Sequence, residues 1–352
     1  MGLLDIKKSA KTAILTRRSS KDLGYFEDEY LDFFSTKSRS PPSINLATYL
    51  RVSSLRLCFD EFFEYFKNER VQFLCLGTGL DTTPYHFLET YDNVVCFDHD
   101  FEEVMKSKAQ IMQKNKKFIE LLPGLRASGY YVTSERYKMV PFDLNHFDKI
   151  SVLLDSGISG TLPTLILSDL CMSHLKTESS NKLLQWFADF FKGPVLYLCL
   201  EQLTKDGEKN EFEDVINITG WISHSSIDYP TKESQTKRYT DLGWDGFHIK
   251  FGAYFYNRLS LSERERVLKI ENFTQMELLD NICHLFFLGF AFKNFKDPIF
   301  FDFLFHEISA TDSKMVSLGN DPLPILAIGR NNAEFAKFYT ELSETPIDCV
   351  PF

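Results

Sequence analysis

Residues 71–100 have the sequence VQFLCLGTGLDTTPYHFLETYDNVVCFDHD. A first apolar run ends in a loop containing Gly77 and Gly79, and a second apolar run ends in the acids Asp98 and Asp100. This pattern is typical of two buried strands joined by a helix. In a doubly wound sheet, a glycine turn lets a ligand approach the backbone, and an acid on the next strand accepts hydrogen bonds from ribose hydroxyls. The pattern alone is equally compatible with a nucleoside pocket and with a purely structural turn.

Short apolar runs alternate with helical patterns on the carboxyl-terminal side of this stretch. Further strands are predicted at residues 137–142, 164–168 and 195–200, with helical patterns between them. Four of the five predicted strands end in an acid, and beyond Asp98 and Asp100 these acids are Asp143, Asp169 and Glu201. Buried parallel strands are normally apolar throughout, so acids at their carboxyl ends favour a ligand crevice. We therefore expect an α/β fold with a doubly wound, mostly parallel sheet.

The whole chain, 1–352, is expected to form one enlarged domain, because a chain of this length with 44% hydrophobic residues can bury a large core. A long polar segment after the fifth strand is expected to be functional rather than a bare loop, and we interpret it as a lid. The predicted parts are an N-terminal helical arm (1–66), a cofactor-binding core (67–201), a lid or substrate insertion (202–250), the C-terminal part of the core (251–293) and a C-terminal extension (294–352).

Composition limits the classes of partner. A net charge of -10 and a pI near 5.4 argue against a broad nucleic-acid surface, which needs a surplus of Lys and Arg. The seven cysteines are odd in number and lack a CxxC pair, which favours a reducing, cytoplasmic compartment and no structural zinc. The longest apolar run, residues 285–292, is too short to cross a bilayer. We expect a cytoplasmic monomer that binds neither membrane, metal nor nucleic acid.

The glycine loop itself restricts the cofactor. Thr82 occupies the third position of a dinucleotide fingerprint, where glycine is usual, and Asp81 adds negative charge where a pyrophosphate should lie. Both features make a nicotinamide-dependent dehydrogenase a distant alternative. S-adenosyl-L-methionine has no phosphate, and its ribose hydroxyls, ammonium and sulfonium match an acidic lining. This cofactor is therefore the better match.

An ordered series of sequence blocks between residues 12 and 293 resembles the leucine carboxyl methyltransferase family. The blocks include PPSINLATYLRV (41–52), VCFDHDF (95–101) and a long final block, YNRLSLSERERVLKIENFTQMELLDNICHLFF (256–287). The resemblance implies a class I methyltransferase-like, Rossmann-like fold with a seven-stranded sheet. It further implies methyl transfer from S-adenosyl-L-methionine to the C-terminal leucine carboxylate of a type-2A protein phosphatase catalytic subunit, with S-adenosyl-L-homocysteine as product.

The resemblance also assigns cofactor contacts at matching positions. They are Arg17 and Arg51 for the methionine carboxylate, Gly77 and Gly79 in the glycine loop, Asp100 and alternatively Asp98 for ribose, Asp143 and Leu144 beside adenine, and Asp169 for the ammonium. A guanidinium offers a rigid fork to a carboxylate, so the two arginines suit their role. Pattern alone leaves other interpretations open: a solvated arm for Arg17, a surface cation for Arg51, and a helix cap with a core leucine for Asp143 and Leu144.

The acceptor side is less well defined by the sequence. An α-carboxyl group is ionised at neutral pH, so methylation needs positioning rather than a general base, and we nominate no catalytic base. Candidates for the acceptor side are His174, Glu201 and Lys205. The chain departs from the family pattern at Asp169, where glutamate is usual, at His174, where tyrosine is usual, and at Glu211, where arginine is usual.

Two alternatives remain open at this stage. One is a divergent family member that methylates another carboxylate or a transfer-RNA base, although the acidic charge balance argues against RNA. The other is a regulator that binds the cofactor without transferring its methyl group, and the departures at Asp169, His174 and Glu211 motivate it.

Overall fold

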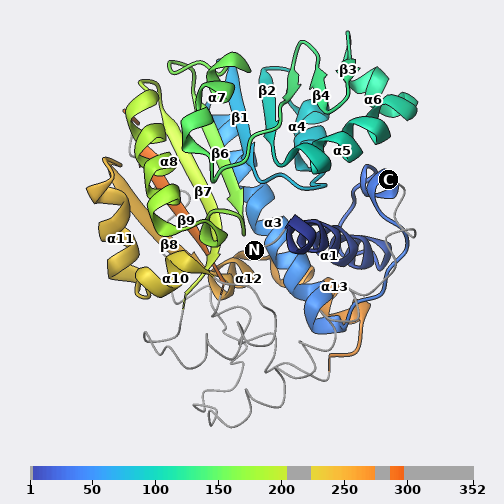
Figure 1. The fold of residues 1–352 in the computed structure, drawn as a ribbon. Coiled ribbons are helices and arrows are strands. Elements are labelled where there is room, and N and C mark those ends of the chain that lie inside the picture. Colours follow the sequence, from blue (N-terminus) through green and yellow to red (C-terminus); the bar gives the residue numbers. More distant parts are fainter. Residues whose placement is uncertain (1–2, 204–222, 274–285, 297–352) are drawn as a thin grey trace.

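A nine-stranded sheet forms the centre of the protein in a computed structural model, which describes residues 3–203, 223–273 and 286–296 (Figure 1). The strand order is β3-β4-β5-β2-β1-β6-β7-β9-β8. Pairing is parallel from β5 through β7 and antiparallel at both edges. The parallel strands are β1 (Val71–Leu76), β2 (Val94–His99), β5 (Tyr137–Met139), β6 (Thr164–Asp169) and β7 (Val195–Gln202). The others are β3 (Arg126–Ser128), β4 (Tyr131–Thr133), β8 (Gly246–Phe251) and β9 (Phe286–Lys293).

The strand order reverses at β1. The chain moves from β1 to β2 and β5 on one side, and then returns to β6 and β7 on the other side of β1. In a doubly wound sheet, the crevice beyond the carboxyl ends of the strands at such a reversal is the usual ligand site. The glycine loop follows β1, and Asp169 is the last residue of its neighbour β6, so both lie at this reversal.

The predicted fold class is confirmed, but the predicted count of seven strands is wrong for the described residues. The two additional strands, β3 and β4, form a short hairpin from a segment that the sequence pattern left without structure. Each has only three residues, and their edge position leaves alternate side chains exposed, so neither produces a readable apolar run. The strand predicted at residues 137–142 ends at Met139, because Pro141 has no N–H for the ladder.

Helices cover both faces of the sheet, as doubly wound folds require (Figure 1). One face packs against α3, α4, α5 and α12, and the other against α7, α8 and the end of α11. The helices of the amino-terminal half are α1 (Leu3–Asp22), α2 (Leu31–Phe34), α3 (Pro42–Tyr65), α4 (Thr83–Thr90), α5 (Glu102–Lys114), α6 (Lys116–Leu121) and α7 (Ser151–Asp155). Those that follow are α8 (Thr177–Phe190), α10 (His224–Asp228), α11 (Lys232–Asp241), α12 (Gly252–Arg258) and α13 (Leu261–Ile270).

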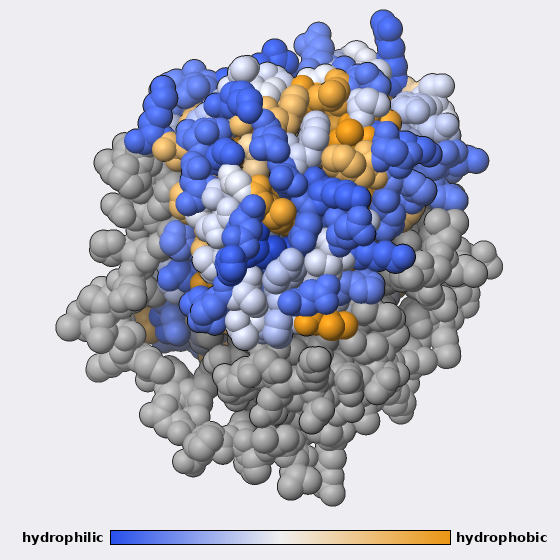
Figure 2. All heavy atoms as spheres, turned by 60° about the vertical axis from the view of Figure 1, so that its left-hand side comes forward, coloured by the Kyte–Doolittle hydropathy of each residue, from blue (hydrophilic) through white to orange (hydrophobic). Residues whose placement is uncertain are grey.

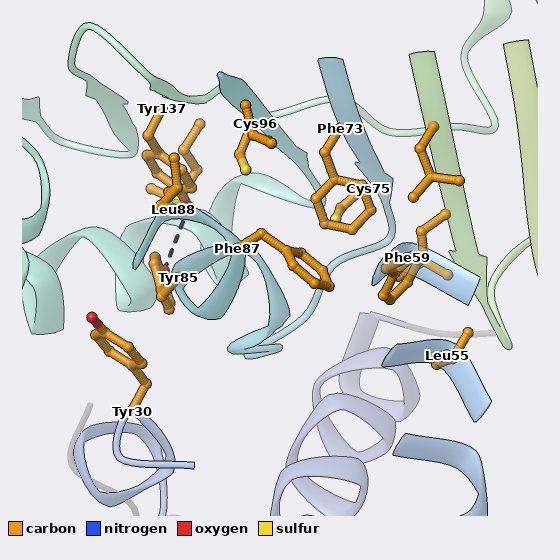
Figure 3. Packing of buried hydrophobic residues seen from close by; sticks show 14 of the residues in the cluster. Tyr30, Leu55, Phe59, Phe73, Cys75, Tyr85, Phe87, Leu88, Cys96 and Tyr137 are labelled. Atoms are coloured by element: carbon orange, nitrogen blue, oxygen red, sulfur yellow. Dashed lines mark hydrogen bonds between the residues drawn. The ribbon is translucent and has the colours of Figure 1, made fainter. Parts of the chain in front are cut away.

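Alternation along the strands supplies both cores. In β1, Phe73 packs on the side of α3 and α4, whereas Leu74 packs on the side of α8. Figure 3 shows Phe59 of α3, Phe73 of β1 and Phe87 of α4 grouped together. Their ring centroids lie 4.9–5.4 Å apart in steep edge-to-face contacts, a favourable geometry for aromatic rings. This packing fixes β1, and with it the loop that follows.

The N-terminal arm is helical and lies at the ligand-binding end of the sheet. Figure 1 shows α1 beside α3, below the carboxyl ends of the parallel strands. Ser19 of α1 donates to the side chain of Asn45 in α3 at 2.8 Å, and Ser20 donates to the carbonyl oxygen of Asn45 at 2.9 Å. These buried bonds fasten α1 to α3, so side chains near the end of α1 are held over the crevice.

The predicted insertion at 202–250 is only partly described, and its last residues belong to the sheet as β8. The division of 1–352 into parts of one domain stays a prediction. Figure 2 shows the face that carries α8 and α11, where hydrophilic residues predominate and apolar ones form small groups between them. In the portions of the chain that the structure describes, no helix is long and apolar enough to span a bilayer.

Candidate cofactor-binding site

A cavity of about 420 Å³ lies beyond the carboxyl ends of β1, β2 and β6. Its volume is in the range of sites for small organic ligands and cofactors. The glycine loop and Asp100 line it, together with Arg17 and Arg51 of the arm and residues that follow β5 and β6. The sheet thus brings together groups that are far apart in the sequence.

The glycine loop requires its glycines. Gly77 and Gly79 have φ values of 60° and 54°, a region that L-residues with a side chain rarely adopt. A Cβ atom on Gly77 would also lie 2.2 Å from the sulfur of Cys171, so the loop has no room for one. The backbone therefore borders the cavity directly, as the sequence pattern predicted for a ligand loop.

Asp100 is held at the cavity wall by main-chain donors. Its Oδ2 accepts from the N–H of Gly79 and its Oδ1 from the N–H of Phe101, each at 2.6 Å. Burial raises the pKa of Asp100 to about 6, although both N–H groups favour the charged form. Each carboxylate oxygen has a further lone pair for a ligand hydroxyl. Asp100 is thus placed to accept hydrogen bonds inside the cavity.

Asp98, the alternative ribose acid, does not line the cavity. Its side chain is fully buried, where Lys108 donates to Oδ2 at 2.7 Å and the hydroxyl of Tyr137 donates to the same oxygen at 2.6 Å. His99 faces the opposite side of β2, and burial lowers its pKa to about 4. Of the two predicted ribose acids, the structure brings only Asp100 to the cavity.

Arg17 and Arg51 converge on one carboxylate. Arg51 pairs with Asp169 Oδ2 through Nε at 3.0 Å and Nη2 at 2.7 Å, and Arg17 Nη2 lies 3.5 Å from the same oxygen. Arg17 also pairs with Asp81. Burial alone would lower the pKa of Arg17, but Asp81 and Asp169 more than offset it and raise that pKa. The guanidinium group of Arg17 is therefore charged at the cavity wall.

The second oxygen of Asp169 is unsatisfied. Oδ1 is buried and, within the described ranges, has no hydrogen-bond partner. A buried acceptor without a partner is costly, and such groups usually mark a ligand, ion or water position. Since Asp169 lines the cavity, a cationic donor on a bound ligand would satisfy this oxygen.

Only one of the two residues predicted beside adenine lines the cavity. Leu144 lines the cavity together with Phe142 and Asn145, whereas Asp143 is absent from the lining. The carboxylate of Asp143 instead accepts from the main-chain and side-chain nitrogens of Asn145, each at 2.9 Å. Asn145 was not identified from the sequence, and its place two residues after Asp143 is the local signal that could have indicated it.

Of the acceptor-side candidates within the described residues, His174 lines the cavity and Glu201 does not. His174 lines the cavity from a short 3-10 turn, Met172–His174. Glu201 does not line it; Ser225 donates to Oε2 at 2.8 Å, and burial raises the pKa of Glu201. Lys205 and Glu211 lie outside the described residues. In those residues, no group of three or more His, Cys, Asp or Glu side chains is placed to hold a metal ion.

A smaller cavity of about 110 Å³ adjoins the first, sharing Thr16, Arg51 and Leu170 with it. Its other walls are mainly apolar and come from α3, β7, α12 and β9; they include Ile44, Ala47, Leu50, Leu200, Phe255, Phe286 and Leu288. Leu170 has a φ of 54°, a rare conformation for a residue with a side chain and one often associated with functional sites. No pattern in the sequence predicts this apolar cavity.

Sequence comparison with known proteins identifies a family. A family model described as leucine carboxyl methyltransferase matches residues 6–188. Leucine carboxyl methyltransferase 1 of Schizosaccharomyces pombe is 25% identical over 82% of this chain and 94% of its own length. tRNA wybutosine-synthesizing protein 4 of Homo sapiens is 24% identical over 80% of this chain but only 43% of its own length. Among solved structures, an O-methyltransferase family protein from Burkholderia thailandensis has a TM-score of 0.40 and 9% identity, covering 72% of this chain and 60% of its own.

Proposed function

Because the chain belongs to the leucine carboxyl methyltransferase family and is therefore an S-adenosyl-L-methionine-dependent methyltransferase, we propose that it methylates the C-terminal leucine carboxylate of a type-2A protein phosphatase catalytic subunit. The observation that carries this choice of acceptor is the apolar cavity beside Arg51 and Leu170. A carboxylate acceptor with an aliphatic side chain has a place for that side chain there.

The larger cavity fits the cofactor group by group. The methionine part is a zwitterion, and the wall offers two guanidinium groups, Arg17 and Arg51, with an unsatisfied carboxylate oxygen on Asp169. We assign the ligand carboxylate to the arginines, which have further N–H donors, and the ammonium to Asp169 Oδ1. Asp100 accepts from the ribose hydroxyls, and Leu144 packs against the adenine. When bound, S-adenosyl-L-methionine supplies a methyl group on a positively charged sulfur.

The protein's contribution to transfer is position and exclusion of water. The attacking group is already an anion, since an α-carboxyl has a pKa of about 3.3–3.7. No side chain need remove a proton, which agrees with a wall that offers guanidinium groups and carboxylates to the ligand. Holding the acceptor oxygen in line with the methyl–sulfur bond lowers the barrier by removing the entropy cost of alignment. Water excluded from the cavity no longer solvates the nucleophile.

The apolar cavity provides the alignment on the acceptor side. It shares Arg51 and Leu170 with the cofactor cavity, so a leucine side chain in it brings its own α-carboxylate to the boundary between the two cavities. Burying that side chain contributes roughly 1.5–3 kcal/mol of binding free energy. A polar or bulky C-terminal residue gains little there. The proposal thus predicts selectivity for a medium-sized aliphatic terminus.

Methylation of a transfer-RNA base is the second candidate, because relatives named tRNA wybutosine-synthesizing protein 4 match most of this chain. The net charge of -10 weighs against it, since RNA binding needs a basic surface. A third candidate is a cofactor-binding regulator, because His174 and Glu211 differ from the residues usual in the family. The ion pairs of Asp169 with both arginines support cofactor binding, which the first and third candidates share, so only an assay of methyl transfer separates these two.

Transfer of a labelled methyl group tests the acceptor. The protein is incubated with labelled cofactor and a type-2A phosphatase catalytic subunit, and in parallel with a subunit that lacks its C-terminal leucine. We expect base-labile label, as a methyl ester gives, on the intact subunit only. Label on both subunits, or on transfer RNA alone, would contradict the proposal. Binding of cofactor with no label on any substrate would favour the regulator.

Filling the apolar cavity tests the assignment of the acceptor side chain. Ala47→Phe places an aromatic ring in the cavity from the side of α3, and Ala47→Ser leaves its volume nearly unchanged. We expect Ala47→Phe to raise the KM for the phosphatase at least tenfold while the Kd for S-adenosyl-L-homocysteine changes less than twofold. Unchanged KM in a folded Ala47→Phe variant would place the leucine elsewhere.

A further inference from the structure

A buried ion pair lies directly under the glycine loop. Lys108 of α5 and Asp98 of β2 both have fully buried side chains, and Lys108 Nζ lies 2.7 Å from Asp98 Oδ2. Removing two charges from water is expensive, and an apolar pair of similar volume is often as stabilising or more so. Neither side chain lines the cofactor cavity. The pair therefore calls for a reason other than ligand contact.

The remaining hydrogen bonds of Lys108 go to the loop. Its ammonium donates to the carbonyl oxygen of Asp81 at 3.0 Å and approaches the hydroxyl of Thr78 at 3.4 Å. Thr78 and Asp81 both border the cofactor cavity on the opposite side of the loop. One ammonium thus connects the end of β2 to both ends of the turn that faces the ligand.

The carboxylate is held through one of its oxygens, Oδ2, whereas Oδ1 is buried and has no hydrogen-bond partner among the described residues. The hydroxyl of Tyr137 donates to Asp98 Oδ2 at 2.6 Å, and Tyr85 lies beneath, with its ring centroid 5.4 Å from Lys108 Nζ. Figure 3 shows the contact between the hydroxyls of Tyr85 and Tyr137, which are 3.5 Å apart. Burial alone would lower the pKa of Lys108, but Asp98 more than offsets it and raises that pKa, so the charge persists at neutral pH.

The loop depends on such anchors, because its glycines permit many backbone conformations. Gly79 is fixed from one side by its N–H bond to Asp100 at 2.6 Å. Lys108 fixes the loop from below, and its bond to the carbonyl of Asp81 also sets the residue whose carboxylate pairs with Arg17. A shift of that residue would move Arg17, which we assign to the cofactor carboxylate.

We propose that Lys108, paired with Asp98, is a positioning residue for the cofactor: it holds the Thr78–Asp81 turn, and through Asp81 the guanidinium of Arg17, in the arrangement that binds S-adenosyl-L-methionine. This inference rests on the proposed cofactor site but not on the identity of the methyl acceptor. A purely structural pair would affect folding alone. A positioning pair affects cofactor affinity in a protein that still folds.

The double variant Lys108→Met with Asp98→Asn tests the proposal. Removing both charges avoids leaving one of them buried without its partner, which a single substitution would do. We expect the Kd for S-adenosyl-L-homocysteine, measured by calorimetry, to rise at least tenfold. The KM for S-adenosyl-L-methionine should rise by a similar factor, while kcat at saturating cofactor falls less than threefold. A Kd within twofold of wild type would overturn the proposal, whatever the change in melting temperature.

Gln72→Leu is the matched control. Gln72 is a buried polar residue at the amino end of β1, where its side chain bonds residues 159 and 164, away from the cavity. We expect a lower melting temperature with an unchanged Kd. An equal loss of affinity in this control would attribute the effect to general destabilisation and overturn the positioning role. Wild-type protein that binds the product but methylates no phosphatase would contradict the proposed acceptor and leave the role of Lys108 intact.

Discussion

At the scale of single residues, Asp169 joins the two sides of the cofactor cavity. One of its oxygens receives both arginines and the other has no partner in the described part of the chain. The family usually has glutamate at this position, and the shorter aspartate still reaches Arg17 and Arg51 because α1 and α3 lie close to the end of β6. Asp169 thus binds the arm through one oxygen and leaves the other for an ammonium.

We expect Asp169→Asn to weaken S-adenosyl-L-homocysteine binding by one to two orders of magnitude. The variant loses a hydrogen bond between charged groups, worth roughly 1.5–3 kcal/mol, and its amide cannot accept at every position where the carboxylate did. Calorimetry gives the Kd. Asp169→Glu is the control and should bind within about tenfold of wild type, because it keeps the charge. Equal Kd values for Asp169→Asn and wild type would exclude this residue from the site.

The pKa of Asp100 predicts how cofactor binding depends on pH. Burial raises that pKa to about 6, so the carboxylate takes up a proton as the pH falls through this value and loses acceptor capacity for ribose hydroxyls. We expect the Kd for S-adenosyl-L-homocysteine to rise several-fold between pH 7.5 and 5. In Asp100→Asn the Kd should be higher at pH 7.5 and nearly independent of pH over this interval. The same pH profile in both proteins would assign the titration to another group.

The raised pKa of Asp100 also affects the stability of the fold. Rising pH favours cofactor binding but lowers this residue's contribution to stability. Its folded-state pKa lies above the ordinary value of 3.8, so the folded protein holds this proton more tightly than the unfolded chain between about pH 4 and 6. The stability that this proton contributes is therefore lost as the pH rises through the window. Asp100 is therefore a position where the requirement for a charged acceptor opposes the stability of the fold.

At the scale of elements, the loop between β1 and α4 combines backbone conformation with close packing. Both glycines adopt positive φ, but only at Gly77 would a Cβ clash with a side chain, the sulfur of Cys171; a Cβ on Gly79 would lie at an ordinary contact distance of 3.5 Å from Ala10. The local sequence explains the first property, since glycine tolerates this conformation. The second depends on the turn after β6, which reaches the loop only because β6 pairs with β1.

We expect Gly77→Ala to lower the melting temperature and to abolish measurable cofactor binding. The left-handed conformation alone costs alanine roughly 1–2 kcal/mol, and the contact with Cys171 adds to it. Gly124→Ala is the matched control, with φ of 72° and open space around the added Cβ. It should show a similar backbone penalty with unchanged affinity. Normal binding by Gly77→Ala would mean that the loop can move without loss of the site.

Secondary structure elements differed in how readily their sequences revealed them. β1, β2, β6 and β7 were predictable because a strand buried on both faces is a mostly apolar run that ends in a glycine turn or a polar residue. The hairpin of β3 and β4 was not, because exposed three-residue strands carry no such run. The place of β8 in the sheet was missed for a related reason: its pairing with β9 is a long-range contact that no local pattern encodes.

At the scale of the whole molecule, the cavity lies between the N-terminal arm and the sheet. Arg17 from α1, Arg51 from α3 and Asp169 from β6 meet there, so a ligand that contacts all three links the two parts. A ligand that binds only the folded protein also stabilises it, by about 2.7 kcal/mol at a concentration one hundred times its Kd. The arm should gain the most, since it forms one wall of the site.

Hydrogen exchange can detect this linkage. We expect S-adenosyl-L-homocysteine to slow amide exchange in residues 10–22 of α1 and 77–81 of the loop, while β7 and α8 change little. Arg17→Met should remove most of the protection of α1, because it loses the side chain that connects α1 to Asp81 and Asp169. Uniform protection throughout the chain would indicate global stabilisation instead of closure of the arm. Protection of α1 that survives Arg17→Met would show that other contacts hold the arm.

The sequence by itself determined the doubly wound parallel core, the glycine loop and the acids at the strand ends, since apolar periodicity and backbone requirements are local properties. The resemblance of its sequence blocks to a known family indicated that family and the role of the two arginines in cofactor binding. Only the tertiary structure decided that Asp100 faces the cavity while Asp98 pairs with Lys108, that Asp143 turns to Asn145, and that an apolar cavity adjoins Arg51. The direction of a side chain and the space beside it depend on which elements pack together, and that packing joins residues far apart in the chain.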